Sequence, residues 1–184
     1  TSTCQSGIYE ADIVRINERY FINIACFGID ADIANDDAFI HNSRLPRALR
    51  FGTGILYHFL SYKKGRHLKL ECGGEVVEGE FTSIVAANSQ YYGGGYRVSP
   101  DSRFDDGIME FYIVDHLSRP RMAKVILSMK DASHLKDPSV RMLRADRAVI
   151  TSPVPIYANV DGEPLYADRF EIELIPKGIR LEYD

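Results

Sequence analysis

Two carboxylates separated by a single glycine lie near the end of the sequence, in the segment VDGEPL (residues 160–165). A glutamate such as Glu163 can act as a base and take a proton from a hydroxyl group within hydrogen-bond reach. Asp161 could orient that glutamate or hold a cation, and Gly162 lets the chain turn tightly between them. A solvated Asp-Gly hairpin between two strands is the alternative interpretation of the same residues.

A second candidate is the glycine-rich segment of residues 88–107 (NSQYYGGGYRVSPDSRFDDG). Its three consecutive glycines, Gly93, Gly94 and Gly95, allow positive φ angles and let a ligand or another backbone come close. No Gly-Lys-Ser/Thr follows them, so the segment is not a Walker phosphate loop. A plain loop between two strands is again the alternative.

The same segment ends in two adjacent carboxylates, Asp105 and Asp106, followed by a glycine. Such a pair can bind a hard cation, with backbone carbonyls of the following residues completing an oxygen shell. The spacing of an EF-hand is absent, and a surface turn is the alternative.

Other polar residues give weaker indications. The stretch FGIDADI (residues 27–33) places two aspartates at the end of a predicted strand, where solubility is the alternative explanation. The five histidines are scattered and give little support to a histidine metal site or a catalytic triad.

The elements that would position these residues are predicted to be mostly strands, because β-branched and aromatic runs alternate with glycine turns. Residues 47–63 and 119–129 have features of helices, and residues 134–139 are predicted to be a short polar loop. Many strands in series with few helices favour a mainly β fold, an antiparallel two-sheet β-sandwich with one or two helices, over a parallel α/β sheet. The predicted strands cover residues 8–17, 20–29, 67–72, 75–88, 108–114, 149–151, 156–160, 170–175 and 179–183.

The composition fits a single globular domain over residues 1–184, with 45% hydrophobic and 26% charged residues. A net charge of −4 argues against a nucleic-acid partner. Three widely spaced cysteines indicate neither zinc nor a disulfide framework and suggest reduced thiols in the cytosol. No apolar run reaches the roughly 18 residues of a membrane span.

In their order along the chain, these segments resemble the C-terminal half of the diacylglycerol kinase catalytic family. That family includes bacterial lipid kinases and sphingosine kinases and is related to NAD kinases, and the resemblance extends over roughly residues 8–183. Its most specific parts are the triple-glycine and Asp-Asp-Gly motif and the closing Asp-Gly-Glu-Pro, here Asn88, Gly93–Gly95, Pro100, Asp105–Met109 and Asp161–Pro164.

The resemblance implies a C-terminal β-sandwich like that of NAD kinases and diacylglycerol kinases. In the family, an N-terminal nucleotide-binding domain carries a Gly-Gly-Asp-Gly-Thr signature, which this sequence does not contain. We therefore expect the chain to be the sandwich domain without its nucleotide-binding partner and to be inactive alone.

The resemblance also implies roles for individual residues. Glu163 matches the proton acceptor, and Asp161 is expected to assist it. A structural Mg²⁺ would be bound by the side chain of Asp106 and by the backbone carbonyls of Met109 and Phe111. The expected cofactor-binding residues, at the cleft between the two domains, are Asn88, Gly93, Gly94 and Gly95.

The implied reaction is transfer of the ATP γ-phosphoryl group to a lipid alcohol such as diacylglycerol. ATP and the catalytic Mg²⁺ would be held mostly by the nucleotide-binding domain. Phe51, Ile55 and Phe59 would form a lipid-facing wall, with core packing as the alternative. We expect a cytoplasmic protein that is peripheral at the membrane and contacts its surface transiently, and that forms a homodimer through an exposed apolar face.

Two other functions stay open. One is a non-catalytic β-sandwich module for carbohydrate or a divalent cation, in which Tyr91, Tyr92 and Tyr96 would form a sugar platform. The other is an NAD kinase relative, although the closing Asp-Gly-Glu-Pro and the triple glycine are more typical of lipid kinases.

Overall fold

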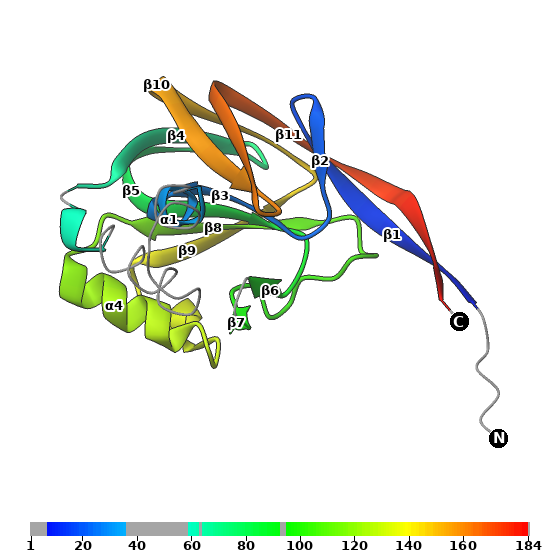
Figure 1. The fold of residues 1–184 in the computed structure, drawn as a ribbon, viewed down its shortest axis with the longest axis horizontal. Coiled ribbons are helices and arrows are strands. Elements are labelled where there is room, and N and C mark those ends of the chain that lie inside the picture. The colour runs from blue at the N-terminus through cyan, green and yellow to red at the C-terminus, as the bar shows by residue number, and fades with distance from the viewer. Residues whose placement is uncertain (1–6, 36–58, 63, 93–94, 184) are drawn as a thin grey trace, which may run out of the picture.

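The computed structural model describes residues 7–35, 59–62, 64–92 and 95–183. This part of the chain is mainly β, and its strand pairs are antiparallel (Figure 1). The elements are β1 (Gly7–Ile16), β2 (Arg19–Phe21), β3 (Ile24–Gly28), α1 (Ile29–Ala34), β4 (Arg66–Cys72), β5 (Glu75–Ala87), β6 (Tyr91–Tyr92), β7 (Tyr96–Arg97), β8 (Met109–Asp115), α4 (Arg119–Ser128), the 3₁₀ helix η1 (Ser133–Lys136), β9 (Val140–Ala145), β10 (Arg147–Val160) and β11 (Glu163–Tyr183).

One hydrogen-bonded network joins nine of the described strands, in the order β2-β1-β11-β10-β3-β5-β8-β9, with β4 pairing both β10 and β5. Strands β3 and β4 therefore occupy successive stretches between the same two long strands. Register shifts interrupt β5 between Phe81 and Ser83 and β10 between Thr151 and Ile156, where one partner gives way to the other. Such irregularities bend a sheet, and the bent sheet packs around the main core.

The main core is lined by apolar side chains from both ends of the sheet order. Phe27 of β3 meets Phe170 of β11 edge to face, with ring centroids 5.0 Å apart, and edge-to-face contact is a favoured aromatic geometry. Leu70, Ile84 and Phe111 are buried in the same cluster. The predicted antiparallel, mainly β fold is confirmed.

The opposite face of β5 and β8 is covered by helices rather than by solvent. Met122 and Val125 of α4 pack with Val114 and Leu117 in a separate cluster. Strand β8 is consequently buried on both faces along Met109–Val114, which explains why its sequence is almost continuously apolar instead of alternating.

Strands β1 and β11 extend from the body as a two-stranded ribbon that carries both ends of the described chain (Figure 1). Gly7 pairs with Tyr183 at the tip of the ribbon. No described helix has the length and apolarity needed to span a membrane.

The predicted single strand over residues 20–29 is wrong in two places. The chain breaks between β2 and β3 at Ile22 and Asn23, and it becomes helical at Ile29. Gly28, with φ of 148°, lies at that second boundary, where its backbone ends the strand and begins α1.

Other elements also differ from the prediction. Strand β9 was not predicted, because its arginines obscure the alternating strand pattern; among the described strands it pairs only with β8, at the edge of the sheet. The predicted polar loop over residues 134–139 begins in η1. The predicted helix over residues 119–129 is confirmed as α4, whereas most of the predicted helix over residues 47–63 lies outside the described residues.

Replacing Gly28 with alanine should destabilise the domain by at least about 2 kcal/mol, because both the φ angle and the packing disfavour a side chain. A Cβ atom there would lie 2.4 Å from the backbone oxygen of Thr82 and 2.8 Å from Cα of Ser83. The free energy of unfolding in urea measures the effect. Gly79→Ala is the matched control, since its Cβ would lie no closer than 3.5 Å to a neighbour. Equal stability of the two variants would contradict the prediction.

Candidate active-site hairpin

The Asp-Gly pair forms a two-residue turn between β10 and β11. Val160 pairs with Glu163 across the turn, and Asp161 and Gly162 have φ angles of 47° and 95°. Two successive positive φ angles are typical of a type I′ hairpin turn. The hairpin prediction is therefore confirmed.

The carboxylate of Asp161 binds a row of backbone N–H groups from the break between β2 and β3. Ile22 donates to Oδ2 at 2.8 Å, Ile24 donates to Oδ1 at 2.8 Å, and Asn23 lies 3.1 Å from both oxygens. In return, the N–H of Asp161 donates to the carbonyl of Ile24 at 3.0 Å. Asp161 thus fixes the turn to residues 22–24, which indicates a positioning role.

Asn88 braces the same segment from the other side. Its Nδ2 donates to the carbonyls of Ile22 at 2.8 Å and Asp12 at 3.2 Å, and its backbone N–H donates to the carbonyl of Asn23 at 2.9 Å. Asn88 is fully buried, and its Oδ1 has no hydrogen-bond donor among the described residues. Asn88 could therefore affect a ligand only by positioning the backbone to which it is hydrogen-bonded.

Glu163 is the uncommitted carboxylate of the hairpin. Its side chain is exposed and forms no hydrogen bond or ion pair with another described residue. The backbone around it is fixed, because Asn159 accepts the N–H of Gly162 at 3.0 Å and Arg19 donates to the carbonyl of Pro164 at 2.9 Å. A rigid backbone carrying an unpaired carboxylate is a suitable arrangement for a general base.

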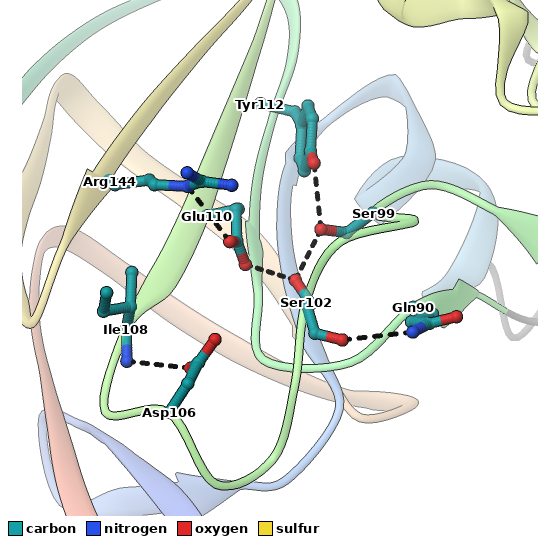
Figure 2. Close-up of polar contacts among 8 residues, drawn as sticks. All are labelled: Gln90, Ser99, Ser102, Asp106, Ile108, Glu110, Tyr112 and Arg144. Atoms are coloured by element: carbon teal, nitrogen blue, oxygen red, sulfur yellow. Dashed lines mark hydrogen bonds and ion pairs between the residues drawn. The ribbon is translucent and has the colours of Figure 1, made fainter.

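A buried polar network holds residues 99–102 on β8 (Figure 2). Ser102 donates to the fully buried carboxylate of Glu110, and Arg144 lies 3.3 Å from that carboxylate's other oxygen. The hydroxyls of Ser99 and Ser102 are 2.5 Å apart, and Ser99 also contacts the hydroxyl of Tyr112 at 2.9 Å. Burial raises the pKa of Tyr112, so its phenol stays protonated.

Sequence reasoning did not identify Glu110 as part of the site's framework. The only signal was a single charge inside the apolar run IMEFYIV. A buried charge is costly unless it is paired, and its presence in such a strand therefore points to partners elsewhere. Those partners, Ser102 and Arg144, lie on a loop and on the unpredicted strand β9.

Asp106 lies in the turn before β8 and is exposed. Its Oδ1 accepts the N–H of Ile108 at 3.2 Å (Figure 2), which leaves Oδ2 uncommitted. Neighbouring Asp105 instead pairs with Arg103 at 3.1 Å. The described residues contain no cluster of three or more His, Cys, Asp or Glu that could hold a metal. A cation here would therefore depend on Asp106 together with backbone carbonyls, an all-oxygen set that suits Mg²⁺.

The turn that carries Asp106 is tied to the far end of the sheet by a buried aspartate. Asp12 accepts the N–H of Gly107 and that of Lys177, each at 2.8 Å. It lies at the register shift between β1 and β11. The turn is thus held in place whether or not a cation binds.

A surface hollow of about 370 Å³ lies beside the hairpin. Asn23, which hydrogen-bonds Asp161, forms part of its wall, together with Tyr91, Arg103 and Asp105. Of the predicted cofactor-binding glycines, Gly95 has a φ of 80°, whereas Gly93 and Gly94 lie outside the described residues. The structure therefore brings the hairpin and the glycine-rich segment to one region of the surface.

The aspartates of residues 27–33 form local hydrogen bonds and an ion pair. Asp30 accepts the hydroxyl of Ser83 at 2.6 Å, and Asp32 pairs with Arg66 at 2.6 Å. Burial raises the pKa of Asp30 to about 6. These contacts tie α1 to β4 and β5.

The tyrosines of the glycine-rich segment differ in exposure. Tyr91 is exposed, whereas Tyr96 is half-buried with Lys130 Nζ 6.0 Å from its ring centroid. The sugar platform stays a prediction, since residues 93–94 between them are not described.

Comparisons with known proteins give a consistent result. A family model described as the YegS C-terminal NAD kinase beta sandwich-like domain matches residues 23–182. A relative from Alcanivorax borkumensis, named a probable lipid kinase YegS-like, is 28% identical over 180 residues, covering 92% of this chain and 57% of the relative. A diacylglycerol kinase of Staphylococcus saprophyticus is 25% identical over 152 residues, covering 83% and 49%.

Solved structures show the same fold. A diacylglycerol kinase from Bacillus anthracis aligns with a TM-score of 0.64 at 16% identity, over 97% of this chain and 55% of that protein. A second structure from the same organism gives 0.70 at 19% identity. The chain spans about half the length of the curated relatives that it matches.

Removing the carboxylate of Asp161 should loosen the hairpin. In Asp161→Ala three backbone N–H groups lose their acceptor, and the free energy of unfolding should fall by about 1–2 kcal/mol. Asp161→Asn keeps one acceptor and tolerates a positive φ, so its loss should be smaller. Hydrogen exchange at Ile22 and Ile24 should accelerate in the alanine variant. Unchanged exchange at both amides would contradict the assigned role, and Asp168→Ala, an exposed position on β11, is the control.

Proposed function

The chain belongs to the family described as the YegS C-terminal NAD kinase beta sandwich-like domain, and from this membership we propose that it is the C-terminal domain of an ATP-dependent lipid kinase. The proposed acceptor is a lipid alcohol such as diacylglycerol, in line with relatives named lipid kinase and diacylglycerol kinase. The observation that carries the proposal is the exposed carboxylate of Glu163, which is uncommitted although hydrogen bonds hold its hairpin in place.

In the proposed reaction, Glu163 accepts the proton of the lipid hydroxyl as the hydroxyl oxygen attacks the γ-phosphorus of ATP. A new bond joins that oxygen to phosphorus, the bond from phosphorus to the bridging oxygen breaks, and ADP leaves. Because such transfer depends mainly on positioning, the hydrogen bonds from residues 22–24 to Asp161 would contribute by fixing the direction of the hairpin.

The nucleotide site is proposed to lie on a second domain with a Gly-Gly-Asp-Gly-Thr signature, which residues 1–184 do not contain. That domain would hold ATP and the Mg²⁺ that neutralises phosphate charge during transfer. The glycine-rich segment would face it across a cleft, and buried Asn88 would contribute by positioning the backbone of residues 22–24. The chain on its own is then expected to lack kinase activity.

The proposal also includes a structural Mg²⁺ beside β8. Its ligands would be the side chain of Asp106 and the backbone carbonyls of Met109 and Phe111. The support is chemical, because the carboxylate of Asp106 is exposed with one oxygen uncommitted, and oxygen ligands suit this ion. When bound, the ion would stiffen the turn that Asp12 already anchors.

A lipid alcohol resides in a bilayer, so an enzyme that phosphorylates it must act at the membrane surface. We therefore propose a cytoplasmic protein that contacts the membrane surface transiently, and we also propose a homodimer. Neither depends on the identity of the acceptor lipid.

Replacing Glu163 tests the base. In the protein that carries this chain together with its nucleotide-binding domain, Glu163→Gln should lower turnover of diacylglycerol by about 10²–10⁴-fold. The melting temperature should not change, since the side chain is exposed and has no partner in the part of the chain that the structure describes. Asp168→Asn removes another exposed carboxylate of β11 and should keep full activity. Retained turnover in Glu163→Gln would exclude this residue as the base.

Replacing Asp106 tests the cation. Mg²⁺ should raise the melting temperature of the unaltered protein, because an ion that binds only the folded state stabilises it. Asp106→Ala should lose that rise, whereas Asp105→Ala should keep it, since Asp105 is paired with Arg103. A rise of the same size in Asp106→Ala would contradict the site.

A further inference from the structure

Helix α4 and the two residues that follow it form a strongly basic segment in an acidic protein. Residues 119–130 (RPRMAKVILSMK) contain two arginines, two lysines and no acidic residue, a charge of +4. The whole chain has a net charge of −4, so the remaining residues sum to −8. The basic character of α4 is therefore a local feature and does not follow from composition.

Helix α4 has an apolar buried side and, on the opposite side, an exposed leucine. Met122 and Val125 are buried against the sheet, whereas Leu127 is 64% exposed on the opposite side. Lys124 lies three residues before Leu127, and residues three apart are neighbours on a helix surface. Lys130 lies in the turn that follows the last residue of α4. The exposed Leu127 thus lies between a lysine on the helix and a lysine in the turn that follows it.

Most of these charges are not neutralised within the described chain. Lys124 forms no ion pair with a described residue, and Lys130 lies 6.0 Å from the Tyr96 ring centroid. Arg121 pairs with Asp137 at 3.0 Å, and Arg119 donates to the carbonyl of Tyr62. Asp131 directly follows Lys130 in the sequence, and its carboxylate accepts the hydroxyl of Ser133. The two lysines beside Leu127 therefore remain available to an anionic partner.

We infer that the outer face of α4 docks on an anionic lipid surface, with Lys124 and Lys130 at the headgroups and Leu127 inserted between them. Two observations favour a bilayer as the partner. The lysines are complementary to the many phosphates that a bilayer presents in one plane, and the exposed leucine would be buried at the boundary between headgroups and acyl chains. The inference rests on the proposed function, because a kinase for a lipid alcohol must reach a substrate that resides in a bilayer. It adds the surface through which contact is made.

Vesicle cosedimentation tests the charges. The protein should bind phosphatidylcholine vesicles that contain phosphatidylglycerol and should bind pure phosphatidylcholine weakly. Each cation at the surface contributes about fivefold to partitioning, so Lys124→Glu/Lys130→Glu should lower binding by at least about twenty-fivefold. Lys69→Glu/Lys177→Glu makes the same change of net charge at exposed lysines of β4 and β11 and should bind nearly normally. Equal losses in the two double variants would overturn the inference.

Fluorescence tests the insertion of Leu127. The chain contains no tryptophan, so Leu127→Trp would place a single tryptophan at the proposed contact. Its emission should shift to the blue on addition of the phosphatidylglycerol vesicles and return when salt is raised from about 0.1 M to about 1 M, where charges are screened. Val76→Trp, at another exposed apolar position (61%) on β5, should not shift. No shift at position 127, or equal shifts at both, would contradict the docking mode.

These measurements are independent of catalysis, so the docking surface and the kinase function can fail separately. Turnover of detergent-dispersed diacylglycerol by the Lys124→Glu/Lys130→Glu form of the complete protein should be normal, while turnover on phosphatidylglycerol vesicles should fall. Absent turnover with intact vesicle binding would overturn the proposed function alone. Intact turnover on vesicles despite the double substitution would overturn the docking surface alone.

Discussion

The hydrogen bonds from residues 22–24 to one carboxylate are the constraint on which the candidate site depends. Ile22 and Asn23 lie between β2 and β3, and Ile24 begins β3; buried backbone N–H groups that stay unpaired are costly. Asp161 accepts all three. The same bonds fix the β10–β11 turn, so the break between two strands and the direction of the hairpin that carries Glu163 have one physical cause.

Further buried polar groups extend this constraint to the rest of the site. Asn88 holds the carbonyl side of residues 22–24, Asp12 holds the turn at Gly107, and Glu110 holds the loop that contains Ser102. Each group lies inside the protein, where its hydrogen bonds to a loop or turn are strong and restrict the motion of that segment. The loops are thus held by hydrogen bonds where apolar packing alone would leave them mobile, and exposed Glu163 lies on a fixed backbone.

The sequence predicted the fold class well, and the framework of the site less well. The Asp-Gly turn could be predicted because a type I′ turn has a local residue requirement. The role of Asp161 could not, because its partners lie about 140 residues earlier and are backbone groups without a sequence signature. Strand β9 was not predicted for a related reason. An edge strand tolerates exposed arginines, and these interrupt the alternation of apolar and polar residues that indicates a strand. Glu110 is the opposite case. One charge in an apolar strand indicates a buried polar network, but the sequence does not show which residues pair with it.

The geometry of the turn gives the two carboxylates of Asp-Gly-Glu different surroundings. Aspartate tolerates the positive φ of the first turn position and is short enough for its carboxylate to reach nearby backbone N–H groups. Glycine meets the second positive φ, and the third residue must then begin a strand, where Glu163 pairs with Val160. The carboxylate of Asp161 accepts three backbone N–H groups, whereas that of Glu163, at the exposed start of a strand, has no hydrogen-bond partner among the described residues. One glycine between them is therefore sufficient to place an anchored carboxylate and an exposed, uncommitted one two positions apart in the sequence.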